Sequence, residues 1–217
     1  MLYFNDAPAV GGDNNGDMTD AFNWFSDEAC QNPIVATPTS ADDVTLLANV
    51  RKFTGISCRT ITSNGFNLES TASSTSMNVY ADGSVFTNCH IGFGIINFTN
   101  VPSASGGQTL TLINSYIDTD ATVENGNNAI LNTTSYNNGT ISGFRDGVIF
   151  NNNSYNNGTL SGNGFITFNN NSYSKVTVSG TINLSAPGTS ALAIVATSLA
   201  AFTRIKQSSE NPLLPPI

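Results

Sequence analysis

Two aspartates spaced two positions apart, Asp118 and Asp120, are the side chains with the clearest catalytic potential, and Glu124 follows closely. On a β-strand, residues two apart point to the same face, so both carboxylates would share one surface. Paired carboxyl groups can act as general acid and as base or nucleophile in glycoside hydrolysis. The surrounding sequence offers nothing that would keep one of them protonated while the other is ionised. We therefore interpret them as solvated loop charges and predict no enzymatic activity.

Three further groups could react or bind a metal ion. Cys89 precedes His90, but adjacent strand residues point to opposite faces, so we expect no thiol–imidazole pair. Cys30 and Cys58 could form a disulfide, although nothing in the sequence indicates an oxidising compartment. Residues 13–20 are rich in oxygen ligands that suit Ca²⁺, but methionine stands where an EF-hand loop needs glycine. We interpret this segment as a polar turn and expect neither metal nor cofactor.

The composition restricts the classes of partner. Only 10% of the 217 residues are charged, and 7 basic residues face 15 acidic ones, which gives a net charge of −8. Such a surface repels phosphate backbones and anionic lipids, so we expect no nucleic-acid or membrane partner. Hydrophobic residues make up 39% of the chain and include 13 phenylalanines, enough apolar surface for a folded core.

A repeated unit in the middle of the chain predicts the structural elements that hold these residues. A Ser-Tyr pair recurs at nearly regular intervals, with its tyrosine at Tyr116, Tyr136, Tyr155 and Tyr173. After two of these tyrosines the chain reads Asn-Asn-Gly-Thr, then Ile or Leu, then Ser-Gly. Alternating apolar and polar residues with Gly and Asn between them are typical of short strands joined by tight corners.

This repeat predicts an all-β fold of the parallel β-helix (solenoid) class. One such unit, of about 18–20 residues, cannot bury its apolar side alone, whereas stacked copies share a continuous core. We expect about seven coils, with tyrosines and asparagines stacked as ladders between them. The predicted inward-facing residues are Ile141, Phe150, Leu160, Phe168 and Val178. The alternative, an antiparallel β-sandwich or jelly roll, fits the strand spacing but does not require repeated sequences.

Changes in composition divide the chain into three regions. Residues 1–50 form an acidic segment that carries the only tryptophan, residues 51–190 carry the repeats, and residues 191–217 form an apolar strand and a proline-rich tail. Trp24 and Phe25 could cap the first coil, as a solenoid end requires, or contact a partner. Leu213 and Leu214 in the tail could dock into a neighbouring subunit.

The repeat units resemble virion structural proteins of marine tailed phages, which are tail-fibre-like and carry repeats of the type Gly-Thr-Val-Ser-Gly-Asn-Ala-Thr-Phe-Asn-Asp-Ser-Ser. The likeness rests on the Gly-Thr-Ile/Leu-Ser-Gly segments, on Val-Ile-Phe-Asn-Asn-Asn-Ser-Tyr-Asn-Asn at 148–157, and on Pro-Thr-Ser-Ala-Asp-Asp-Val at 38–44 after Trp24. It covers residues 3–50 and 130–185. It implies a non-enzymatic fibre, knob or capsid decoration on the virion surface.

The same resemblance implies that the partners are other virion proteins and further copies of the chain, with a homotrimer as the expected assembly. A glycan of the host surface is a further candidate partner. Residues 1–6 carry no basic region and no apolar stretch, so we expect no secretion signal, which favours the phage interpretation. Two alternatives stay open: a bacterial surface adhesin, and a tailspike-like protein that binds or depolymerises polysaccharide.

Overall fold

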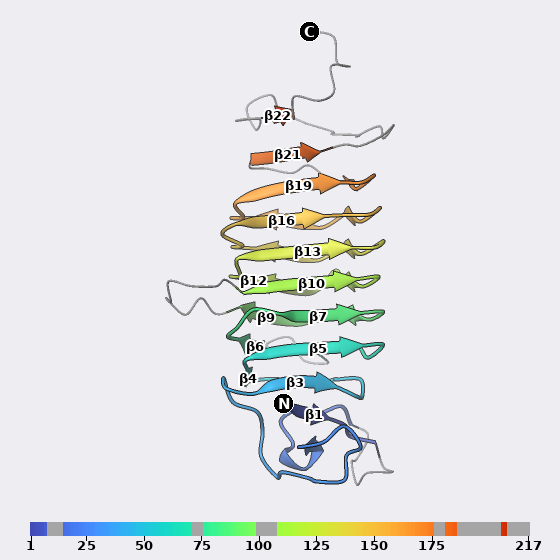
Figure 1. The fold of residues 1–217 in the computed structure, drawn as a ribbon, viewed down its shortest axis with the longest axis vertical. Helices are drawn as coiled ribbons and strands as arrows, with labels where there is room; N and C mark the ends of the chain where they lie inside the picture. Colours follow the sequence, from blue (N-terminus) through green and yellow to red (C-terminus); the bar gives the residue numbers. More distant parts are fainter. Residues whose placement is uncertain (8–14, 71–75, 99–107, 176–180, 186–204, 208–217) are drawn as a thin grey trace.

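The computed structural model describes residues 1–7, 15–70, 76–98, 108–175, 181–185 and 205–207 (Figure 1). Over this part of the chain the backbone winds into a parallel β-solenoid of about six turns. Its one helix in these segments is the short 3-10 helix η2 (Ala21–Asn23). The prediction of an all-β parallel β-helix is confirmed, and the antiparallel sandwich is excluded.

Each complete turn adds one strand to each of three sheets, and the strand order within every sheet follows the chain after the first two strands. The eleven-stranded sheet contains, in spatial order, β2 (Trp24–Phe25), β1 (Leu2–Phe4), β3 (Asp43–Leu46), β5 (Thr60–Asn64), β7 (Ser84–Thr87), β10 (Thr109–Ile113), β13 (Asn128–Asn132), β16 (Gly147–Phe150), β19 (Phe165–Asn169), β21 (Thr181–Ser185) and β22 (Ile205–Gln207).

The two other sheets are built from shorter strands. The five-stranded sheet contains β8 (His90–Ile91), β11 (Tyr116–Ile117), β14 (Tyr136–Asn137), β17 (Tyr155–Asn156) and β20 (Tyr173–Ser174). The six-stranded sheet contains β4 (Ile56–Cys58), β6 (Ser76–Val79), β9 (Gly94–Phe98), β12 (Ala121–Glu124), β15 (Thr140–Ser142) and β18 (Thr159–Ser161).

The strands pair in parallel, with the single exception among the named strands of β1 with β2. Register sets the length of each coil. Ala129 pairs with Val148 and Val148 with Ile166, so these coils have the same length as the sequence repeat. Two earlier coils are longer, since Thr62 pairs with Val85 and Ser84 pairs with Leu110. The regular repeat therefore describes only the later coils.

Alternation along each strand places one side chain in the core and the next outside, as the period of a β-strand requires. The predicted core residues Ile141, Phe150, Leu160 and Phe168 are all buried, and the rings of Phe150 and Phe168 stack with centroids 5.0 Å apart. Val178 lies outside the described residues. The apolar core is continuous from coil to coil.

Asparagines supply the sharp corner that follows each of several strands of the eleven-stranded sheet. Asn114, Asn152 and Asn170 have φ of 47°, 53° and 48°, in the left-handed region that asparagine tolerates better than most residues. Thr133 and Thr134 take the same conformation, with φ of 50° and 60°. These corners direct the chain from the eleven-stranded sheet into the five-stranded sheet.

Trp24 and Phe25 are enclosed at the N-terminal end of the solenoid. They are 0% and 2% exposed, the Trp24 ring meets Phe4 edge-on with centroids 5.3 Å apart, and its Nε1 donates to the carbonyl of Met18 at 2.9 Å. An exposed partner contact through Trp24 and Phe25 is therefore incorrect, because pairing of β2 with β1 buries both rings. Phe22 is the aromatic residue exposed here, at 64%.

Two further features of the ends bear on the predicted regions. Strand β3 lies within residues 1–50 yet pairs in parallel with β5, so the stacked sheet begins inside the N-terminal region. The tail residues Leu213 and Leu214 lie outside the described residues. Across the described part of the chain, no helix has the length and apolar character that a membrane span needs.

Candidate functional site

The predicted tyrosine ladder runs along the five-stranded sheet. Tyr116, Tyr136, Tyr155 and Tyr173 pair in register. Their ring centroids are 4.7, 4.9 and 5.5 Å apart, and neighbouring rings lie within 17° of parallel. These distances match the spacing of neighbouring strands, so the stacking follows directly from in-register coils. Burial raises the pKa of Tyr116 and Tyr136, which keeps both phenols neutral.

His90 occupies the next position of the same ladder. It pairs with Tyr116 in register, and the two rings stack with centroids 5.0 Å apart. The Tyr116 hydroxyl lies 3.2 Å from His90 Nδ1, and His90 Nε2 lies 2.7 Å from a carboxylate oxygen of Glu69. Both ring nitrogens of His90 therefore have partners.

Cys89, the neighbour of His90, points the other way, as predicted. Its thiol is buried and lies 3.8 Å from the Ser115 hydroxyl, inside the solenoid. Burial raises the pKa of this thiol, which disfavours the thiolate needed for nucleophilic attack. All three cysteines are free, so Cys30 and Cys58 do not form a disulfide here. Burial raises the pKa of Cys58 to about 12.

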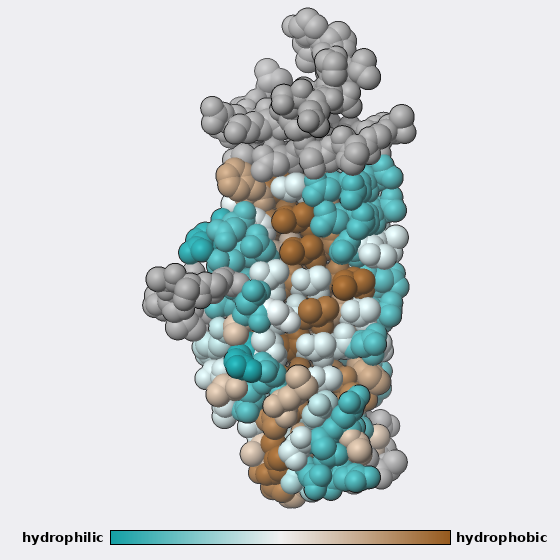
Figure 2. All heavy atoms as spheres, in the orientation of Figure 1, coloured by the Kyte–Doolittle hydropathy of each residue, from teal (hydrophilic) through white to brown (hydrophobic). Residues whose placement is uncertain are grey.

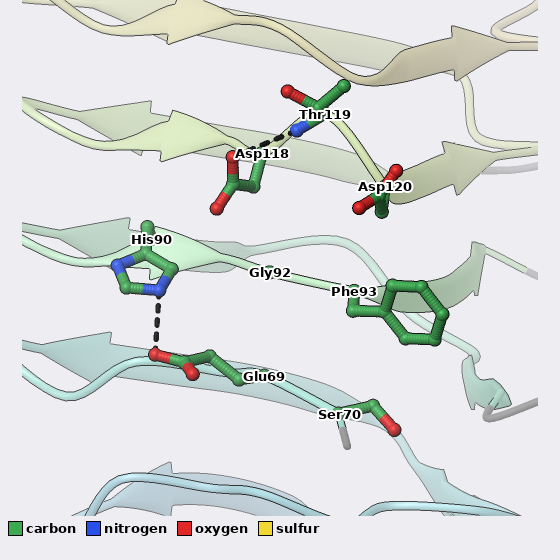
Figure 3. Close-up of a pocket in the computed structure, with 8 residues that line it drawn as sticks. All are labelled: Glu69, Ser70, His90, Gly92, Phe93, Asp118, Thr119 and Asp120. Atoms are coloured by element: carbon green, nitrogen blue, oxygen red, sulfur yellow. Dashed lines mark hydrogen bonds and ion pairs between the residues drawn. The ribbon is translucent and has the colours of Figure 1, made fainter. Parts of the chain in front are cut away.

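A hollow of about 250 Å³ opens beside His90, at the end of the tyrosine ladder (Figure 3). Three successive coils contribute to it, and its lining residues are Glu69, Ser70, His90, Gly92, Phe93, Asp118, Thr119 and Asp120. The coils are held in this order by a parallel bridge between Leu68 and Ile91 and by the pairing of β8 with β11. We call this feature the acidic hollow.

The sequence marks three residues of the acidic hollow, His90, Asp118 and Asp120, as separate candidates, and the structure brings all three together. Asp118 and Asp120 lie in the turn between β11 and β12, in agreement with loop charges rather than a shared strand face. Asp118 accepts a hydrogen bond from the Thr119 amide at 2.9 Å. Glu124 lies on β12 and does not line the hollow.

Two lining residues, Glu69 and Phe93, had no signal of their own in the sequence. Glu69 lies in an early, irregular coil, and only the register of that coil brings its carboxylate to His90. The hollow thus combines three carboxylates, an imidazole, two hydroxyls and a half-buried aromatic ring. Such a set can accept hydrogen bonds from hydroxyl or ammonium groups of a ligand.

Metal binding has no support from the described residues. No group of three or more His, Cys, Asp or Glu side chains among them is arranged to hold a metal ion. In the described part of residues 13–20, Asp17 forms an ion pair with Lys52 at 2.6 Å, and Asp20 accepts from the Phe22 amide at 2.9 Å. Asp17 thus links this segment to Lys52, and Asp20 caps the short helix η2.

Asparagine ladders join the coils at several surface positions, as predicted. Side-chain amides donate to the equivalent amide one coil away in the pairs Asn170 to Asn152 at 3.0 Å and Asn169 to Asn151 at 2.9 Å. Asn152 donates to Asn132, the neighbour of its equivalent position, at 2.6 Å. Each bond joins two successive coils, so these ladders stabilise the stacking itself rather than a single coil.

A second asparagine ladder lies inside the core. Asn137 and Asn156 are fully buried, and Asn137 Nδ2 donates to Asn156 Oδ1 at 2.8 Å, while Asn156 Nδ2 donates to the Ser174 hydroxyl at 3.2 Å. In the preceding coil the equivalent residue is Ile117, which cannot donate. The side-chain oxygen of Asn137 consequently has no hydrogen-bond partner.

Comparison with known proteins gives no relative: no protein family, curated protein or solved structure matches this chain.

Proposed function

We propose that the chain is a non-enzymatic structural protein of a bacteriophage particle, a β-solenoid rod that forms part of a fibre, a knob or a capsid decoration. The observation that carries the structural role is the in-register stacking of side chains over successive coils. Tyrosine rings stack outside, asparagine amides bond between coils, and the apolar core is continuous. Such an arrangement uses most of the chain for shape and stability.

The chemistry of the ladders supports a role outside the cell. Their stabilising groups are aromatic rings, amides and hydroxyls, whose contacts depend little on pH and salt. The later coils, over residues 128–175, also join their strands by corners of only a few residues. A surface rod benefits from both properties, because it meets variable ionic conditions and proteases.

The assignment to a phage particle rests on the resemblance of the repeats to virion proteins and on the compatibility of a solenoid with such a role. Partners would then be other virion proteins and further copies of the chain. Antibodies raised against the purified chain test this assignment. They are used to detect the chain in particles released by lysis of a bacterial culture that produces the protein. We expect the chain to band with intact particles in a density gradient and to label the particle surface in electron micrographs.

The opposite result of this experiment is also specific. If the chain stays with the envelope of intact cells and is absent from purified particles, the phage assignment is wrong and the adhesin alternative is supported.

The acidic hollow favours a second candidate, binding or cleavage of a surface polysaccharide. Asp118 and Asp120 lie at one side of this hollow and His90 with Glu69 at the other (Figure 3). Incubation with bacterial surface polysaccharides, followed by measurement of new reducing ends, tests cleavage. We expect none from the wild type. New reducing ends that disappear on replacing Asp118 and Asp120 by Asn, but persist in the control Glu124→Gln, would replace the structural proposal by this one.

A further inference from the structure

The outer face of the eleven-stranded sheet carries a column of β-branched side chains. The column follows one register position through successive strands, and its members are Thr45, Thr62, Val85, Thr111, Ile130, Ile149 and Thr167. All of them are half-buried, so their outer surfaces remain accessible. Ile113 lies beside the column on β10 and Phe165, 53% exposed, lies beside it on β19. We call this surface the β-branched column.

The β-branched column forms the apolar part of this face. In Figure 2, hydrophobic spheres gather over β7, β10, β13 and β16, with pale and hydrophilic residues on both sides. Val, Ile and Thr have few side-chain rotamers on a strand, so their burial costs little conformational entropy. A straight row of such residues forms a rigid ridge that another surface can cover.

Charge is absent from the six central strands of the same face, whereas Asp43 on β3, near the end of the column, forms an ion pair with Arg59. The strands β5, β7, β10, β13, β16 and β19 contain no Asp, Glu, Lys or Arg. The chain as a whole carries a net charge of −8, and two copies therefore repel each other at most orientations. If two copies meet through these six strands, no charged residue of one copy faces a charge of the same sign on the other.

We propose that this face pairs with the same face of a second copy of the chain, in a two-fold symmetric dimer. The regular spacing of side chains along the column favours a second copy of the chain as the partner. The side chains of the column repeat once per coil, about every 4.8 Å, and a partner that fits along the whole length must have the same period. Another solenoid of this chain has that period, and a two-fold contact joins identical surfaces.

The area of this face indicates how stable the proposed dimer would be. Six strands, each about five residues long, give a flat area of about 500 Å² per copy, or about 1,000 Å² for the pair. That total lies at the lower limit for a specific interface. We therefore expect a reversible dimer that forms at micromolar concentrations. The inference concerns assembly of the rod and does not depend on its assignment to a phage.

Sedimentation velocity over a range of concentrations tests the dimer, using the full chain. We expect the wild type to change from monomer to dimer as concentration rises. The double variant I130E/I149E places four carboxylates in the proposed interface and should weaken dimerisation at least about 100-fold. The control is Ile95→Glu, since Ile95 is also outward-facing, 38% exposed, but lies on β9 of the six-stranded sheet. This control should dimerise like the wild type.

A second pair of variants separates loss of contact from loss of folding. The variant I130K/I149K should be monomeric alone, yet should form a mixed dimer with I130E/I149E, because the opposite charges then meet. Circular dichroism verifies that each variant is folded. The proposal is overturned if the wild type is monomeric throughout, if it is a trimer, if I130E/I149E dimerises normally, or if the folded charge variants fail to form the mixed dimer.

Discussion

At the scale of single residues, the corners of the solenoid show how a side chain adapts to a left-handed backbone. Asn152 and Asn170 have φ of 53° and 48°, and their amides also bond to neighbouring coils. Thr133 occupies the equivalent corner with φ of 50°. A β-branched side chain crowds the backbone in this conformation, whereas asparagine tolerates it. The later coils thus have a more favourable residue at this corner than the coil of Thr133.

Replacement of Thr133 by asparagine should therefore stabilise the protein. We expect Thr133→Asn to raise the free energy of unfolding by about 0.5–1 kcal/mol, because it relieves the strained corner. Urea denaturation measures the change. Thr119→Asn makes the same exchange in an exposed turn without positive φ and should alter stability by less than about 0.5 kcal/mol. Equal effects of both substitutions would contradict the explanation by strain.

The ion pair of Arg59 with Asp43 gives a pH-dependent contribution to stability. The side-chain hydrogen bond from Arg59 lowers the pKa of the Asp43 carboxyl below its ordinary value. A depressed pKa in the folded state stabilises the protein above the ordinary pKa, and this stabilisation is lost as pH falls through the folded-state pKa. We expect Arg59→Gln to lower stability at pH 7, and this deficit to disappear as pH falls through the folded-state pKa of Asp43.

Thermal unfolding at several pH values measures this difference. Arg145→Gln is the control, because Arg145 and Asp146 are neighbours in sequence and can pair in the unfolded chain as well. A deficit of Arg59→Gln that persists unchanged at the acid limit would show that Arg59 acts through packing and not through Asp43.

At the scale of the elements, the structure of a coil could be predicted from the sequence where the coil carries the repeat, and less well where it does not. The coils that run from Ala129 to Ile166 share the segment Ser-Tyr-Asn-Asn-Gly-Thr, then Ile or Leu, then Ser-Gly, so their strands, corners and core residues could be predicted. The longer coils between Thr62 and Leu110 keep the alternation of their strands but lose the repeated letters. Without a repeat, local pattern alone does not define which residues of neighbouring coils stand in register.

The acidic hollow shows the consequence for the candidate site. Its residues come from three successive coils, two of them among these longer ones, so their meeting depends on a register that the sequence does not reveal. One signal in the sequence could have linked His90 to the tyrosine ladder. One coil before Ser115-Tyr116, the pair Cys89-His90 occupies the position of the repeated Ser-Tyr pair. Glu69 has no such marker.

Glycine is required where the coils meet most closely, at the corner between the five-stranded and six-stranded sheets. A Cβ atom on Gly139 would overlap the carbonyl oxygens of Asp118 and Ala121 in the preceding coil. We expect Gly139→Ala to lower the free energy of unfolding by about 2–3 kcal/mol, because backbone of two coils would have to separate. Chemical denaturation provides the measurement.

A matched glycine gives the comparison. The Cβ of Gly92→Ala would meet the Glu69 Cγ at 3.0 Å, a side-chain atom that can move, so we expect a loss below about 1 kcal/mol. Equal losses of stability in the two alanine variants would contradict the explanation that glycine is needed at position 139 because the coils lie so close there.

At the scale of the whole molecule, uncharged contacts dominate the stability of the solenoid. In the ion pairs Lys52–Asp17, Arg59–Asp43, His90–Glu69 and Arg145–Asp146, at least one of the two side chains is exposed to solvent. Exposed pairs contribute little and are screened by salt. The core, the ladders and the backbone bonds between strands carry the fold instead.

Salt should therefore have little effect on this protein. We expect the free energy of unfolding to change by less than about 1 kcal/mol between about 0.05 and about 0.5 M NaCl, since neither attraction nor repulsion of charges is a major term. Urea denaturation at the two salt concentrations measures it. A large rise in stability with salt would instead mean that repulsion within the chain of net charge −8 limits its stability.

The direction of the backbone bonds determines how the rod responds to mechanical force. Strands lie across the long axis, so the bonds between coils point along it (Figure 1). Tension applied at the two ends of the chain therefore peels one coil from the next and breaks a few bonds at a time. A sideways load is shared among many coils at once. Stretching in an optical trap should consequently yield a series of small, coil-sized extensions at low force, while the same rod resists bending as one body.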